Sequence, residues 1–306
     1  MSNSQHNILG NIMYCAGGWS QSLAKDLKQE KVNALELLDD WPDFSCFEGY
    51  ADKIECLKVC GGTENGRISA LNNIDIFKGL KKLRILSKVK KPYDLTKLRD
   101  LELIDAVWQP SLSTAFSGDK LNNAIINSVD DSFFEHSIEN SYVEQLWLAR
   151  PKVDSLNLLE YFPGLTSLRL TESNKIKSLN GLAYCNGIEK VDIEGLSKLT
   201  DGNELRLLDK LKYLRMMKVS PDFDVSVFDE DTSIERISFC GPKSPTLPWA
   251  TLLKSSKIRA VYGWWGKPFN EEEILGFLPA GIKPKKIENT AGTKNNPAIT
   301  VELLIK

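Results

Sequence analysis

The sequence is short of the residues that build most catalytic and metal centres. It has two histidines, His6 and His136, which lie far apart in the chain. No group of His, Cys, Asp and Glu residues has the spacing of metal ligands. The pairs Gly17-Gly18 and Gly61-Gly62 are not followed by the Lys-Ser/Thr that a phosphate-binding loop needs. The sequence therefore predicts no enzyme, no metal site and no cofactor.

Long apolar runs and an excess of charge are also missing. No segment approaches the roughly 18 consecutive apolar residues of a membrane-spanning helix, and the first 20 residues lack the pattern of a secretory signal. The 39 basic and 41 acidic residues nearly balance, which argues against nucleic acid as the main partner. The six cysteines are scattered, as reduced thiols are: Cys15, Cys46, Cys56, Cys60, Cys185 and Cys240. We therefore expect a cytoplasmic protein with no membrane partner.

What the sequence does contain is a repeat, the six-residue pattern apolar-x-x-apolar-x-apolar. It is clearest at residues 165–170, LTSLRL. The same frame returns at 188–193, 211–216 and 234–239, each start 23 residues after the last, and 143–148 begins 22 residues before Leu165. Less regular copies occupy 32–37, 54–59, 80–85, 98–103 and 121–126, and a partial copy at Ile258 has Gly263 in the third apolar place. About eleven copies predict a solenoid of stacked strands.

The pattern also predicts which side chains are buried. In a strand, positions four and six point inward together, and position five points to the opposite face. The return segment of each repeat must fill the core as well. Apolar residues do so every third place in two units, at Ile176, Leu179, Leu182 and Cys185 and at Leu199, Leu205 and Leu208. A period of three favours 3₁₀ or short helical turns.

Residues 165–187, LTSLRLTESNKIKSLNGLAYCNG, resemble the short 22–23-residue leucine-rich repeats of bacterial and some eukaryotic intracellular proteins. The resemblance implies an α/β solenoid, a horseshoe with a concave parallel β-sheet and a convex side of 3₁₀ and short helical turns. The family carries an asparagine after the strand that satisfies buried backbone groups, and only Asn174 suggests it here. The fold alone does not fix a function.

The repeats divide the chain into three parts: an N-terminal cap at 1–31, the array at 32–265 and a C-terminal cap at 266–306. A helix is expected over 20–30 in the first cap. In the second, Asn270 with Glu273 three residues later is a capping-box-like start for a helix that ends near Phe277. Residues 283–296 are rich in Lys, Asn and Gly and predict a loop, and 299–305 alternate like a final strand.

Position five of the repeats predicts a column of side chains on the concave face. That column is Glu36, Lys58, Arg84, Glu102, Ile125, Trp147, Arg169, Asp192, Arg215, Ser238 and Tyr262, with Tyr213, Met217, Cys240 and Trp264 beside it. Arg, Trp and Tyr are enriched at binding hot spots. We therefore predict a protein-binding site made of Trp147, Arg169, Asp192, Tyr213, Arg215, Met217, Tyr262 and Trp264. The alternative is that Arg169, Asp192 and Arg215 only neutralise one another across adjacent strands.

A basic run over residues 81–99 suits an acidic partner or nucleic acid, and alternatively forms a solvated rim. The function predicted for the chain is that of a non-enzymatic module that grips a specific cytosolic protein. An inhibitor, such as an immunity protein that neutralises a toxin or effector domain, is one form of it. A scaffold or adaptor with several weaker partners is a second, and an enzyme-linked effector is a third.

Overall fold

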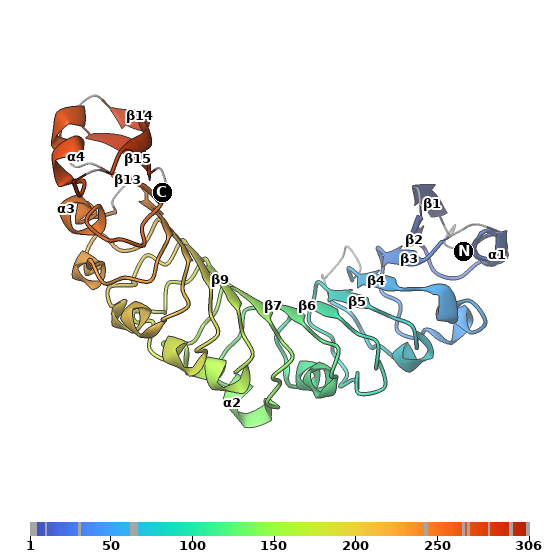
Figure 1. The fold of residues 1–306 in the computed structure, drawn as a ribbon. Coiled ribbons are helices and arrows are strands. Elements are labelled where there is room, and N and C mark those ends of the chain that lie inside the picture. Colours follow the sequence, from blue (N-terminus) through green and yellow to red (C-terminus); the bar gives the residue numbers. More distant parts are fainter. Residues whose placement is uncertain are drawn as a thin grey trace. The chain divides into compact units, whose positions relative to one another are not determined.

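The computed structural model describes residues 5–9, 11–29, 32–61, 67–241, 244–264, 267, 270–280, 282–293 and 296–303. The chain divides into two compact units, Met1–Leu146 and Trp147–Lys306. In each unit the strands line one side, and the 3₁₀ turns and short helices lie on the other (Figure 1). This is the α/β arrangement that the repeats predict.

In the first unit, strands β2 to β7 pair in parallel in chain order, and β1 pairs with β2 in the antiparallel sense. The strands are β1 (Gln5–Leu9), β2 (Ile12–Ala16), β3 (Ala34–Leu37), β4 (Cys56–Val59), β5 (Lys82–Ile85), β6 (Leu103–Val107) and β7 (Asn123–Asn127). The helices are α1 (Gln21–Gln29) and α2 (Phe133–His136), with 3₁₀ turns at Ser45–Phe47, Ala51–Lys53, Ile74–Ile76 and Pro110–Ser117.

In the second unit, strands β9 to β13 pair in parallel, and β15 and β14 continue the sheet in the antiparallel sense. The strands are β9 (Ser167–Thr171), β10 (Lys190–Glu194), β11 (Tyr213–Met217), β12 (Arg236–Cys240), β13 (Ala260–Trp264), β14 (Pro284–Thr293) and β15 (Asn296–Leu303). The helices are α3 (Trp249–Leu252) and α4 (Glu271–Phe277), with 3₁₀ turns at Asn157–Tyr161, Leu182–Tyr184, Asn203–Leu207 and Val225–Val227. Strand β8 (Gln145–Ala149) spans the division between the units.

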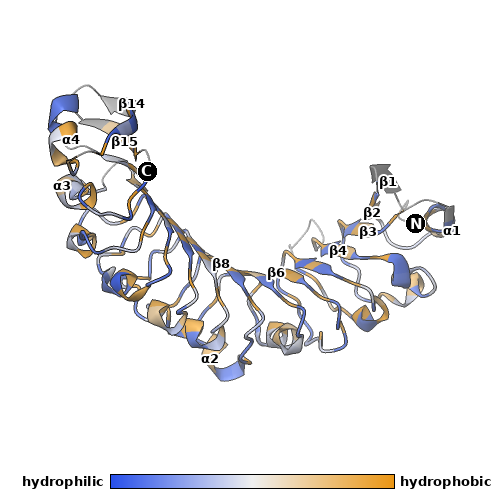
Figure 2. Cartoon of the chain, viewed as in Figure 1, coloured by the Kyte–Doolittle hydropathy of each residue, from blue (hydrophilic) through white to orange (hydrophobic). Residues whose placement is uncertain are grey.

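The predicted strand frame is confirmed where the repeats are most regular. Leu168 and Leu170 are fully buried, and Arg169 between them is only partly covered. The equivalent residues Val191, Ile193, Leu214 and Ile237 are buried as well. Figure 2 shows hydrophobic and hydrophilic residues side by side along the strands of each unit. The alternation arises because successive side chains of a strand point to opposite faces.

The return segments fill the core as the period of three predicts. The seven residues expected to do so are all buried: Ile176, Leu179, Leu182, Cys185, Leu199, Leu205 and Leu208. The 3₁₀ turns at Leu182–Tyr184 and Asn203–Leu207 carry two of them, Leu182 and Leu205.

One repeat frame was wrong. Residues 98–103 were expected to form a strand, but β6 begins at Leu103, and its pattern starts at Leu101. Ile104 and Ala106 are the buried pair, so position five is Asp105 and not Glu102. Leu98 is buried in the turn before the strand, which is why its apolar character misled the alignment.

The two ends differ from expectation in part. Helix α1 lies within the predicted 20–30, of which Glu30 is outside the described residues. Strand β2 pairs in parallel with β3, so strand pairing begins within 1–31. Asn270 caps α4 as predicted, because its side-chain oxygen accepts from the N–H groups of Glu272 and Glu273. The division into caps and array stays a prediction.

The loop expected at 283–296 was wrong over most of its length, because Pro284–Thr293 is strand β14; residues 294 and 295 lie outside the described part of the chain. The backbone of β14 pairs with β15, and this tertiary pairing outweighs a Lys- and Asn-rich composition. The final strand, β15, begins at Asn296 and so includes the predicted residues 299–303; residues 304 and 305 lie outside the described part of the chain.

The prediction for Asn174 was also wrong, since its side chain is exposed. The buried hydroxyl of Ser173 takes the role instead. It donates to the carbonyl oxygen of Pro151 at 2.9 Å and accepts from the N–H groups of Lys175 and Ile176. A hydroxyl both donates and accepts, so Ser173 satisfies backbone groups on two neighbouring turns.

The residue after a strand often adopts a left-handed conformation. Residues with positive φ directly after a strand are Gly17, Ser128, Arg150, Glu172, Gly195, Lys218 and Gly241, and Gly61 lies two residues after β4. In this conformation the N–H of Glu172 donates to the Glu194 carbonyl, and that of Gly195 donates to the Met217 carbonyl. The turn therefore links each repeat to the next just beyond the strands.

We expect Leu168→Ala to lower the free energy of unfolding by about 2–5 kcal/mol, because it leaves a cavity in the core. Arg169→Ala, one residue away on the other face, should cost much less. Urea unfolding followed by circular dichroism measures both. Equal losses for the two variants would contradict the strand frame.

Gly181→Ala should lower the free energy of unfolding about as much as Leu168→Ala, because the added methyl group would collide with the backbone. An added Cβ would lie 2.4 Å from the Leu156 carbonyl carbon and 2.5 Å from the Asn157 nitrogen, and φ is 101°. Backbone atoms cannot move aside as side chains do, so we expect a loss of about 3 kcal/mol or more. Gly276→Ala in α4 is the control, because nothing lies within 4 Å of the added Cβ. An unchanged urea midpoint for Gly181→Ala would refute the close approach.

Candidate protein-binding face of the second unit

Positions three, five and seven of strands β9 to β13 share one face of the second unit, which we call the open face. Its residues are Ser167, Arg169, Thr171, Lys190, Asp192, Glu194, Tyr213, Arg215, Met217, Arg236, Ser238, Cys240, Ala260, Tyr262 and Trp264. The strands pair in register, so equivalent positions stand side by side, as Asp192 does between Arg169 and Arg215. One strand per repeat, parallel pairing in register and a return through 3₁₀ turns identify the repeat architecture. The chain has the leucine-rich-repeat fold.

Position five carries a chain of interactions that begins at Trp147 on β8. The guanidinium carbon of Arg169 lies 4.3 Å from the centre of the Trp147 ring, a cation–π contact. The indole N–H of Trp147 donates to the Thr171 hydroxyl at 2.9 Å. Arg169 Nε then lies 3.8 Å from an oxygen of Asp192. The ring and the cation are thus held against the sheet.

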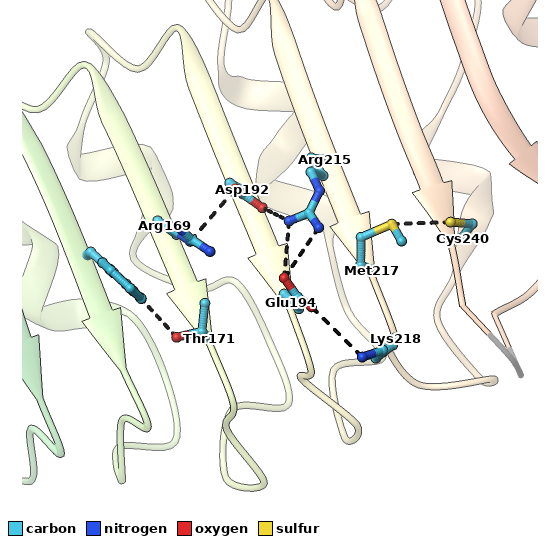
Figure 3. Close-up of polar contacts among 9 residues, drawn as sticks. Arg169, Thr171, Asp192, Glu194, Arg215, Met217, Lys218 and Cys240 are labelled. Atoms are coloured by element: carbon cyan, nitrogen blue, oxygen red, sulfur yellow. Dashed lines mark hydrogen bonds and ion pairs between the residues drawn. The ribbon is translucent and has the colours of Figure 1, made fainter. Parts of the chain in front are cut away.

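Arg215 anchors the other end of this chain (Figure 3). One nitrogen of its guanidinium lies 2.7 Å from Asp192, and the group also bonds Glu194 at 3.3 Å. Glu194 in turn lies 3.9 Å from Lys218. Partial burial lowers the pKa of Arg215, but its bonds to Asp192 and Glu194 outweigh that effect and raise the pKa overall. Asp192 is only 16% exposed, and its carboxylate forms ion pairs with both Arg169 and Arg215.

Two further predicted residues, Trp264 and Met217, make contacts within the second unit. The indole N–H of Trp264 donates to the Gly241 carbonyl at 2.6 Å, and the Trp264 carbonyl accepts from the indole of Trp249. Met217 contacts Cys240 at a sulfur–sulfur distance of 3.2 Å. Cys240, expected beside the column on the surface, is 5% exposed and belongs to the core.

A groove of about 320 Å³ runs across strands β10 to β13 between the residues at positions three and five. Its floor is the edge of the buried residues Val191, Leu214, Ile237 and Val261. Its sides are formed by Lys190, Tyr213, Arg236 and Ala260 and by Arg215, Ser238 and Tyr262, with Thr300 of β15 at one end. Tyr213 is 45% exposed, the largest exposure of any hydrophobic side chain on this face.

The structure therefore brings together six of the eight predicted site residues, while Met217 and Trp264 do not line the groove. Trp147, Arg169, Asp192 and Arg215 form one contact chain, and Tyr213 and Tyr262 join Arg215 in the groove. The sequence-based site omitted Lys190 and Arg236, which line the groove. The repeat frame could have found them, since they occupy the same position three as Tyr213.

The first unit carries a similar face with different chemistry. Its position-five charges are paired, Lys58 with Glu36 at 2.5 Å and Arg84 with Asp105 at 2.8 Å. A groove of about 310 Å³ lies beside them, with Cys56 and Lys82 among its lining residues. All six cysteines of the chain are free thiols, and burial raises the pKa of Cys15 and of Cys185 to about 12.

Within the described residues, no helix combines the length and apolar character needed to cross a membrane. In the same part of the chain, no three His, Cys, Asp or Glu residues are grouped to hold a metal ion.

No protein-family model matches the chain, and no curated protein is similar to it in sequence. Among solved structures, it is similar to internalin InlF of Listeria monocytogenes, with 15% identity and a TM-score of 0.43 over 63% of this chain. The chain spans 57% of the length of that internalin. The functional domain of InlJ from the same organism, which includes a cysteine ladder, is 12% identical over 92% of this chain and 77% of its own, with a TM-score of 0.40. Internalin C2 is 16% identical over 69% of this chain and 73% of its own, with a TM-score of 0.30.

A double-mutant cycle should measure the coupling at the centre of the open face. Asp192→Asn and Arg215→Met should show a coupling energy of about 1 kcal/mol in urea unfolding, because the carboxylate is largely buried. The control cycle uses the ion pair of Glu189 and Lys212, which are 3.1 Å apart and whose side chains are both exposed. Its coupling should stay below about 0.5 kcal/mol. Equal coupling in the two cycles would contradict the role given to burial.

Proposed function

We propose that the chain is a non-enzymatic, cytoplasmic protein-binding module that grips one specific protein on the open face of its second unit. The observation that carries this proposal is the half-exposed ring of Tyr213 beside an apolar groove. The core does not need this ring, and tyrosine is among the residue types that dominate binding energy. Hence the face offers a partner both apolar area and a hydrogen-bonding group.

The contact chain at position five supports the same proposal. Arg169 stacks on Trp147, and Asp192 and Glu194 hold Arg215. Side chains that are already fixed lose little conformational entropy when a partner engages them. Trp147, Arg169, Asp192, Arg215, Met217, Tyr262 and Trp264 therefore serve the proposed site as a rigid frame around Tyr213.

Within this function we propose an inhibitor of the immunity-protein type, which neutralises a toxin or effector domain by covering it. A rigid face of mixed charge and aromatic rings suits tight, specific binding. The second candidate is a scaffold with several partners. The groove of the first unit favours it, because that groove offers a separate surface of different chemistry. An inhibitor should abolish its partner's activity at a one-to-one ratio, whereas a scaffold should leave that activity intact.

The test compares two tyrosines. Tyr213→Ala should weaken partner binding by more than 1 kcal/mol, about fivefold in Kd. The control is Tyr184→Ala, which removes a ring that is 53% exposed in the turn Leu182–Tyr184, on the opposite side of the repeat. It should leave binding unchanged, and the melting temperatures of both variants should stay close to that of the wild type.

Quantitative affinity capture from native lysate, followed by calorimetry with the purified partner, provides the measurement. A protein retained by the wild type and Tyr184→Ala but lost by Tyr213→Ala supports the proposal. If every captured protein also binds Tyr213→Ala, the open face is not the binding site.

A further inference from the structure

Position three of the open face carries two positively charged side chains, Lys190 and Arg236. In-register pairing places Lys190, Tyr213 and Arg236 side by side on β10, β11 and β12. All three side chains are exposed. Among the described residues, no carboxylate forms an ion pair with Lys190 or Arg236. The two cations are therefore available to a partner.

The acids closest in sequence already have partners. Glu189, next to Lys190, pairs with Lys212 at 3.1 Å, and Glu235, next to Arg236, pairs with Arg259 at 3.2 Å. Glu302 of β15, which stands opposite Ala260, pairs with Lys285 at 3.5 Å. Positions two and five of the repeats thus hold compensated charge, and position three does not.

The open face consequently differs in sign from the whole chain. Its four cations, Arg169, Lys190, Arg215 and Arg236, outnumber the acids Asp192 and Glu194, which leaves a net charge of +2. The whole chain has a net charge of −2. Such a local field attracts acidic groups and repels basic ones.

The groove between the two cations is apolar. Its floor is formed by Val191, Leu214 and Ile237. Tyr213 lines it on β11, and the small side chains of Ser238 and Ala260 line it on β12 and β13. Its volume of about 320 Å³ lies at the lower end of the range for ligand pockets. An apolar side chain inserted there loses contact with water and covers the Tyr213 ring.

From this arrangement we infer that the partner presents a segment in which an apolar side chain lies between two carboxylates. The apolar side chain fills the groove beside Tyr213, and the carboxylates pair with Lys190 and Arg236. The two cations stand two strands apart, or about 10 Å, a separation that one short peptide segment spans. The inference rests on the proposed function and names the chemistry of the bound segment.

The experiment selects peptides from a displayed library of random dodecamers on the full-length protein. Three proteins are compared: the wild type, Lys190→Glu/Arg236→Glu, and the control Lys88→Glu/Lys90→Glu. The control changes net charge by the same amount, at exposed lysines of the first unit. Neither Lys88 nor Lys90 is among the residues that line the grooves of the two units.

We expect the wild type and the control to enrich peptides that carry Asp or Glu on both sides of an aliphatic or aromatic residue. These peptides should bind Lys190→Glu/Arg236→Glu at least tenfold more weakly. Replacing their acids with Lys should restore binding to that variant. Added salt should weaken wild-type binding, because the contacts are exposed charge pairs.

Selection of neutral or basic peptides, or of none, would overturn the inference, as would acidic peptides that bind the charge-reversed variant as tightly as the wild type. The failure of this inference can be told apart from the failure of the proposed function. If a captured protein is lost with Tyr213→Ala but retained by Lys190→Glu/Arg236→Glu, the open face binds that protein and only the acidic segment is refuted.

Discussion

In-register parallel pairing is the constraint on which the rest of this structure depends. A strand of a leucine-rich repeat has no partner within its own repeat, so its apolar side chains are buried only when the next repeat stacks on it. Stacking in register places Val191 between Leu168 and Leu214 in the core. It also places Asp192 between Arg169 and Arg215 on the open face. A slip of one residue would exchange the two faces. The core and the open face are therefore fixed by the same pairing, and the energy of the core determines which surface side chains become neighbours.

The same constraint explains how much of the fold could be predicted. Where the spacing is regular, from Leu165 to Ile258, the apolar pattern has one consistent frame, and the strands form there. Around residue 100 two frames satisfy the pattern, because Leu98, Leu101, Leu103 and Ile104 are all apolar. The structure chooses the later frame, in which Leu98 is buried in the turn before β6. Strand β14 had no such signal, since it forms by pairing with β15 and not by burying an alternating pattern.

The candidate site was predictable to a different degree. The repeat frame identified the surface strand positions and the residue types on them. It did not reveal which charges pair, because that depends on side-chain reach across strands. Arg215 forms ion pairs with both Asp192 and Glu194, which lies two residues further along the same strand. Arg169 makes a cation–π contact with Trp147. The interpretation that these charges neutralise one another and the interpretation that they bind a partner were posed as alternatives. The geometry makes the two compatible, since a compensated row holds the wall of the groove in place.

Positions three and five of the open face differ in whether their charges are paired within the fold. A surface charge that is paired within its own fold must break or share that pair to bind a partner, which reduces the net gain. An exposed and unpaired charge loses only its hydration, and part of that loss is recovered from an incoming carboxylate. In the proposed site, position five, with Asp192 between two arginines, therefore contributes rigidity. Position three, with Lys190 and Arg236 flanking Tyr213, contributes the interactions that a partner would make. Both positions line the same apolar groove. In the proposed site, position five would fix the shape of the groove, and position three would set its preference for charge. The proposed specificity for one partner would rest on that division, because a basic segment that fits the groove would still meet two uncompensated cations.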